Sequence, residues 1–115
     1  MTIQPLTERD LEARVLNAAG PVMVDFYQAS CPPCRVLEPR LEQLARQPGR
    51  EVPVYRVDID RDLAIAERFA VKSIPTVLVM YRGKEVERLD GLITQDGLAG
   101  AFARAASLRT GAATP

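Results

Sequence analysis

Strand-length runs of apolar residues alternate along this chain with segments of helical periodicity. The runs at 22–27, 52–59 and 76–81 are apolar or rich in β-branched residues and are predicted to be strands. Between them, apolar residues recur every three or four positions, which is typical of helices that pack on one face. Strands joined through helices predict a parallel core, and a turn at 82–84 adds an antiparallel edge strand over 85–90. The chain is therefore predicted to be an α/β protein with a mixed central sheet of four to five strands and helices on both faces.

Polar residues mark the expected starts of three helices. Thr7 and Asp10 have the spacing of a capping box and are predicted to begin the first helix. Asp60 is expected to cap a short helix that runs through Ala70. Thr94 is expected to open the last helix.

Length and composition favour one small domain without special partners. The 115 residues are predicted to form a domain over 1–109 and a frayed tail over 110–115. Fifteen basic residues balance fifteen acidic ones, so no surplus of positive charge attracts nucleic acid or an anionic membrane. The longest apolar run, 74–81, is too short to span a bilayer. The first ten residues lack the pattern of a secretory signal, so we expect a cytoplasmic protein.

The chain has two cysteines, Cys31 and Cys34, and no histidine. A disulfide framework needs several bridges, and a zinc or iron–sulfur site needs about four soft ligands. No metal is therefore expected within one chain, and a site shared between two chains is a minor alternative. Without histidine, hydrolases that depend on a Ser–His or Cys–His pair are excluded.

The two cysteines have a position suited to thiol–disulfide exchange. Cys31 lies between the end of an apolar strand and the start of a helix, where free backbone N–H groups and the helix dipole favour a thiolate. The thiolate is the nucleophile in disulfide exchange. The two residues that follow allow Cys34 to reach the first sulfur and to resolve a mixed disulfide. The alternative is a pair of small buried apolar residues, which this position makes less favoured.

Asp25 interrupts the otherwise apolar strand at 22–27. Burial of a carboxylate is costly and raises its pKa, so Asp25 could take the proton that Cys34 must lose. It could instead be a structural acid held by Arg56 or by a backbone donor. The two interpretations overlap, because Arg56 on the neighbouring strand could also tune the acid.

Pro75 opens the strand at 76–81. A proline at a strand start can be a simple boundary marker. It could also form a cis peptide bond with Ile74, which would expose the backbone of Ile74 beside the cysteines to an extended substrate. Position alone does not decide between the two.

The segment around the cysteines resembles the active-site stretch of the thioredoxin family. Residues 24–35 read VDFYQASCPPCR, and the usual form in that family is VDFWAxWCGPCK. Pro39 matches the family's helix-kinking proline, and the VKSIPT segment at 71–76 resembles its cis-proline loop. Gly83 and Gly91 fall where the family has its hairpin and groove glycines. The resemblance covers about residues 6–107 and implies the thioredoxin fold.

The resemblance also implies roles for individual residues. Cys31 would be the attacking thiol, Cys34 the resolving thiol and Asp25 the buried proton-transfer acid. Pro75 would be cis, and Arg56 stands where the family has a lysine near that acid. The residues that would line the substrate groove are Ser30, Pro32, Ile74 and Gly91.

Three residues depart from the family's usual form. Pro32 replaces a glycine, which bears on the reduction potential. Ser30 replaces a tryptophan, which removes a flat aromatic surface that a reductase would contact. Tyr27 replaces another tryptophan and keeps an aromatic ring.

The function implied by the resemblance is that of a general protein-disulfide reductase. Such a protein would be a monomer without a bound cofactor, would act on disulfide-containing proteins, and would receive electrons from NADPH through a thioredoxin reductase. One alternative is a specialised thiol–disulfide oxidoreductase for one partner, which glutathione could supply with electrons. The other is a thioredoxin-like binding or chaperone module whose cysteines are incidental.

Overall fold

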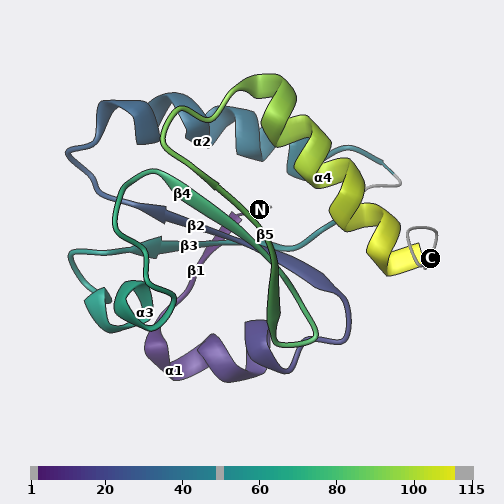
Figure 1. Ribbon diagram of the computed structural model, residues 1–115, viewed down its shortest axis with the longest axis horizontal. Coiled ribbons are helices and arrows are strands. Elements are labelled where there is room, and N and C mark those ends of the chain that lie inside the picture. The colour runs from purple at the N-terminus through teal and green to yellow at the C-terminus, as the bar shows by residue number, and fades with distance from the viewer. Residues whose placement is uncertain (1–2, 49–50, 111–115) are drawn as a thin grey trace.

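A five-stranded sheet runs through the middle of the fold and has helices on both faces (Figure 1). The computed structural model describes residues 3–48 and 51–110. The strands, in chain order, are β1 (Ile3–Pro5), β2 (Pro21–Tyr27), β3 (Val54–Asp58), β4 (Thr76–Tyr81) and β5 (Lys84–Asp90). They lie side by side in the order β1-β3-β2-β4-β5. The predicted α/β architecture is therefore confirmed, with the larger of the two expected strand numbers.

β1 is a strand that the sequence pattern does not predict. This strand has three residues and pairs in parallel with β3, with Ile3 opposite Val54. Of the three, only the side chain of Ile3 is buried. A single buried residue carries no alternating pattern, so the strand is recognisable only from its pairing.

The direction of β4 corrects the prediction of a parallel core. β1, β3 and β2 are parallel, but β4 runs antiparallel to β2, with Thr76 opposite Phe26. The connection over 59–75 contains one short helix, α3 (Leu63–Arg68, six residues), whereas the parallel strands β2 and β3 are joined through the 14-residue α2 (Pro32–Ala45). β4 therefore begins at the end of the sheet where β2 and β3 finish. Pro75, which precedes β4, and Cys31, which follows β2, thus lie at the same end of the sheet.

Two predicted helix starts are confirmed. The Thr7 N–H donates to Oδ1 of Asp10 (2.8 Å) at the start of α1 (Glu8–Leu11), which continues as a π-helical turn over Glu12–Leu16. The Gly97 N–H donates to Oγ1 of Thr94 (3.0 Å) at the start of α4 (Gln95–Thr110). Of the predicted tail, Thr110 is the last residue of α4, and 111–115 lie outside the described residues.

The predicted cap of α3 is wrong. Asp62 rather than Asp60 precedes the helix, which ends at Arg68 and not at Ala70. The Asp60 N–H donates to Oδ1 of Asp58 (3.0 Å), so Asp60 belongs to the turn after β3. Ala70 has a positive φ of 53°, which a helix does not allow.

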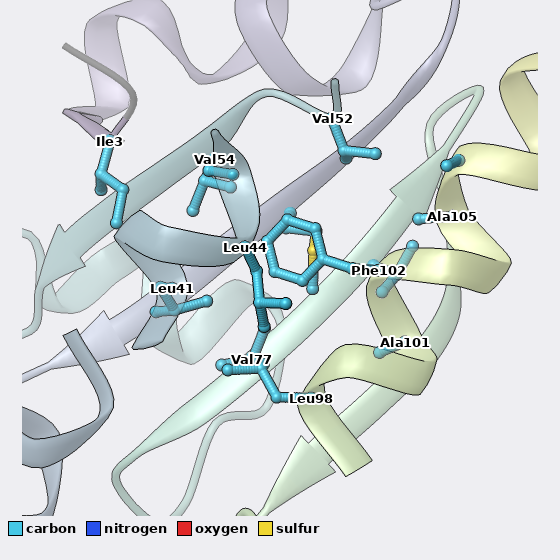
Figure 2. Close-up of a cluster of buried hydrophobic side chains, with 14 of the residues drawn as sticks. Ile3, Leu41, Leu44, Val52, Val54, Val77, Leu98, Ala101, Phe102 and Ala105 are labelled. Atoms are coloured by element: carbon cyan, nitrogen blue, oxygen red, sulfur yellow. The ribbon is translucent and has the colours of Figure 1, made fainter. Parts of the chain in front are cut away.

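The sheet separates two apolar clusters. One lies under α2 (Pro32–Ala45) and α4, where Figure 2 shows Phe102 among side chains from α2 and the sheet. The other lies under α1 and α3. Side chains of β2 alternate between them, so Met23 packs in the first and Val24 in the second. By the same alternation Asp25 belongs to the face covered by α2. Within residues 3–48 and 51–110, no helix has the length and apolarity needed to cross a membrane.

Candidate redox site

The two cysteines meet at the start of α2, which follows β2 through a short loop. Cys31 and Cys34 are joined in a disulfide, with their Cα atoms 5.3 Å apart. Both side chains are largely buried, and Cys31 is the residue immediately before the helix. The predicted pairing of the two cysteines is therefore present in the structure.

The helix start supplies a hydrogen-bond donor to Cys31. The Cys34 N–H donates to Sγ of Cys31 (3.2 Å). Pro32 and Pro33 occupy the first two helical positions and have no N–H, so Cys34 carries the first free amide of the helix. When the disulfide is open, this amide and the positive end of the helix dipole favour a thiolate on Cys31.

Asp25 is a carboxyl group inside the protein. Its side chain is 3 % exposed, and Oδ1 has no hydrogen-bond partner. Burial raises the pKa of Asp25 to about 7; the nearby Arg56 cation lowers it in part, and the negative charge of Glu38 adds to the rise. Asp25 therefore gains and loses its proton near neutral pH, close to the range in which thiols ionise.

Arg56 lies opposite Asp25 in the pairing of β2 with β3. Its Nη1 forms an ion pair with Oε2 of Glu38 on α2. Its guanidinium carbon lies 3.9 Å from the centre of the Tyr27 ring. Arg56 therefore does not hold Asp25 through an ion pair, because its ion-pair partner is Glu38.

Glu38 is a site residue that the sequence analysis misses. It lies four positions after Cys34, so the two side chains share one face of α2. A pocket of about 320 Å³ beside Cys34 includes Tyr27, Glu38 and Arg56 in its lining. The spacing from Cys34 on an expected helix was the signal that could have identified it.

The Ile74–Pro75 peptide bond is cis, as the resemblance implies. Pro75 directly precedes β4, and the Thr76 hydroxyl donates to the carbonyl oxygen of Ser73 (2.6 Å) at this turn. Because β4 runs antiparallel to β2, with Thr76 opposite Phe26, this turn lies at the end of the sheet where β2 leads to the cysteines.

An apolar groove of about 250 Å³ lies between α2 and the loop after β5. Of the four residues predicted to form a groove, Gly91 lines it, whereas Ser30, Pro32 and Ile74 are not among its lining residues. Gly91 has a positive φ of 68°, which favours glycine. Leu92 is a lining residue that the sequence analysis misses, and its side chain is 93 % exposed. Its position directly after the predicted groove glycine was an available signal.

The described part of the chain contains no group of three or more His, Cys, Asp or Glu residues that could hold a metal ion.

A family model described as Thioredoxin matches residues 2–104. The chain belongs to the thioredoxin family. The bovine "Thioredoxin, mitochondrial" is 38 % identical over 89 residues, which are 77 % of this chain and 54 % of that protein. The chain thus spans about half the length of the mitochondrial relatives. The thioredoxin of Chlamydia trachomatis is 44 % identical over 81 residues, or 70 % of this chain and 78 % of that one.

Solved thioredoxin structures have the same fold. A mutant thioredoxin from Halobacterium salinarum superposes with a TM-score of 0.80 at 30 % identity, and 90 % of each chain is covered. The thioredoxin of Malassezia sympodialis superposes with a TM-score of 0.82 at 24 % identity, again over 90 % of each chain. The thioredoxin fold predicted from the sequence is therefore confirmed.

The three departures from the usual thioredoxin form now have structural positions. Tyr27 stacks against Arg56 beside the pocket. Ser30 is exposed in the loop before Cys31. Pro32 removes one N–H from the helix start, which leaves Cys34 as the donor to Cys31.

Proposed function

We propose that this member of the thioredoxin family reduces disulfide bonds in other proteins by thiol–disulfide exchange. The observation that carries the proposal is the geometry at the start of α2, where Cys31 Sγ accepts an amide hydrogen bond and Cys34 lies within disulfide distance. A buried acid on the adjoining strand, Asp25, has a pKa of about 7. The start of α2 thus supplies the nucleophile and the resolving thiol, and the adjoining strand β2 supplies a proton acceptor.

The reaction starts from the dithiol form. The Cys31 thiolate attacks one sulfur of the substrate disulfide, so a Cys31–substrate bond forms as the substrate S–S bond breaks. The departing substrate sulfur takes a proton from solvent. Cys34 then gives its proton to the Asp25 carboxylate and attacks Cys31 Sγ, which expels the second substrate sulfur. Two electrons pass to the substrate, and the protein is left with the Cys31–Cys34 disulfide.

The substrate side of the proposal rests on the groove and on the turn before β4. Ile74 is expected to present its backbone to an extended substrate segment, with Ser30 and Pro32 near the attacking sulfur. The exposed Leu92 and the open surface around Gly91 offer apolar area that a substrate would cover. The surface suits a stretch of polypeptide better than a small enclosed ligand.

The electron donor is proposed to be NADPH acting through a thioredoxin reductase, with no cofactor bound to this chain. The protein is proposed to act as a monomer in the cytoplasm, because a dithiol reductant needs a reducing compartment. A second candidate, a specialised oxidoreductase for one partner, is favoured by Ser30, which lacks the aromatic surface of the usual family member. A binding or chaperone module has no need for a buried acid beside a cysteine pair.

Insulin reduction tests these alternatives. The protein is assayed once with NADPH and thioredoxin reductase and once with dithiothreitol as electron donor, with Cys31→Ser as the control. Activity with both donors supports the general reductase, and activity with dithiothreitol alone supports the specialised protein. Inactivity with both contradicts the proposed function and favours the binding module.

A further inference from the structure

Glu38 and Arg56 form an ion pair above the buried acid. Glu38 comes from α2, one helical turn after Cys34, and Arg56 comes from β3, directly opposite Asp25. The side chains of Arg56 and Glu38 are 29 % and 40 % exposed, so the pair lies where the pocket beside Cys34 opens to solvent. Ion pairs with this exposure add little to stability, which suggests another reason for its presence.

The two charged side chains that shift the pKa of Asp25 come from two elements packed around it. α2 contributes Glu38, and β3 contributes Arg56. On β4, the residue opposite Asp25 is Val77, and the buried residues of α4 on this face are apolar. The protonation of Asp25 therefore depends on how these two opposite charges are arranged.

The arrangement keeps the cation from neutralising the acid. Nη1 of Arg56 is paired with Glu38, and its guanidinium group is stacked on Tyr27. Oδ1 of Asp25 has no hydrogen-bond partner. A guanidinium group without Glu38 would be free to approach the Asp25 carboxylate, and opposite charges in a buried region attract strongly.

We propose that Glu38 is a positioning residue that holds the Arg56 guanidinium against Tyr27 and away from Asp25, and thereby sets how strongly Asp25 binds the proton that Cys34 releases. This inference rests on the proposed function for its purpose, but the geometry it describes exists in the oxidised protein. A carboxylate paired with arginine is a weak proton acceptor, because its pKa falls well below that of a thiol. By holding Arg56 away, Glu38 keeps Asp25 a stronger proton acceptor.

The test is a titration of the Asp25 carboxyl carbon by NMR in the oxidised protein, where neither cysteine titrates. In Glu38→Gln we expect the midpoint to fall by about 0.5–1 pH unit relative to the wild type, since Arg56 is released and a negative charge is lost. Glu42→Gln is the matched control, because it removes one charge from the same helix and from an ion pair with Arg46. That variant should leave the midpoint unchanged.

A second background separates positioning from direct repulsion. Arg56→Met removes the cation, and the shift caused by Glu38→Gln should then shrink to less than half. An equal shift in both backgrounds would show that Glu38 acts only through its own charge and would overturn the proposal. An unchanged or higher midpoint in Glu38→Gln would overturn it as well. None of these readouts needs catalytic activity, so a protein that fails to reduce insulin would refute the proposed function without deciding this titration.

Discussion

The two faces of β2 are equally well buried but serve different ends. Val22, Val24 and Phe26 pack under α1 and α3 in an apolar cluster. The opposite face carries Met23 in the core under α2 and α4, and beside it the carboxyl group of Asp25. One face is arranged for packing alone. The other accepts an ionisable group where burial disfavours its charge, and this is the face covered by the helix that begins at the cysteines.

Phe26→Ala should have the largest effect on stability, because it opens a cavity in the apolar cluster under α1 and α3. Phe26 is fully buried and contacts Phe69 edge-on, with ring centres 6.3 Å apart. We expect a loss of about 3–5 kcal/mol in the free energy of unfolding. Urea titration of the oxidised protein measures it. A loss below about 1 kcal/mol would mean that this face is not the packed core described here.

Asp25 should make the stability of the oxidised protein depend on pH. Its pKa is about 7 in the folded chain against 3.8 for an unperturbed aspartate, so the folded state binds the proton more tightly. The contribution of Asp25 to stability should therefore be greatest below about pH 4, fall as the pH rises to 7, and then level off, for a total of about 4 kcal/mol. Asp25→Asn should remove this slope and equal or exceed the wild type above pH 7. Parallel curves for the two proteins would place the charge of Asp25 in solvent.

Leu92→Ser should have the smallest effect and should separate recognition from packing. The side chain is exposed in the groove, so its loss should change stability by less than about 0.5 kcal/mol. The KM for a protein disulfide should rise about three- to tenfold, since an apolar contact is lost. Leu63→Ser, at an exposed position on α3, is the matched control and should leave KM unchanged. An equal change in KM for both substitutions would show that the groove does not bind the substrate.

Features encoded in neighbouring residues were predictable from the sequence. The cysteine pair, the Thr7 and Thr94 caps and the buried acid in an apolar strand each depend on a few adjacent positions. Features that depend on contacts between distant segments were not predictable from the sequence. Ile3 becomes a strand residue only by pairing with Val54, and the direction of β4 is seen only in its pairing with β2.

Glu38 illustrates the same limit within the site. It is one of two acidic residues on α2, and its partner Arg56 lies on β3. Its spacing from Cys34 marks the face of the helix, but it does not show that Glu38 reaches β3 whereas the ion pair of Glu42 with Arg46 stays within the helix and its cap. Only the packing of α2 on the sheet selects Glu38, and sequence periodicity gives the face of a helix but not its alignment with a strand beneath it.

The most direct test of the account is to trap the mixed disulfide. Reduced Cys34→Ser is mixed with a protein disulfide, and the product is examined by mass spectrometry without reductant. We expect a stable covalent adduct on Cys31 that dithiothreitol releases, because the attacking thiol is intact and the resolving thiol is absent. Cys31→Ser under the same conditions should give no such adduct. An adduct on Cys34 in Cys31→Ser, with none on Cys31 in Cys34→Ser, would reverse the two roles and contradict the central claim.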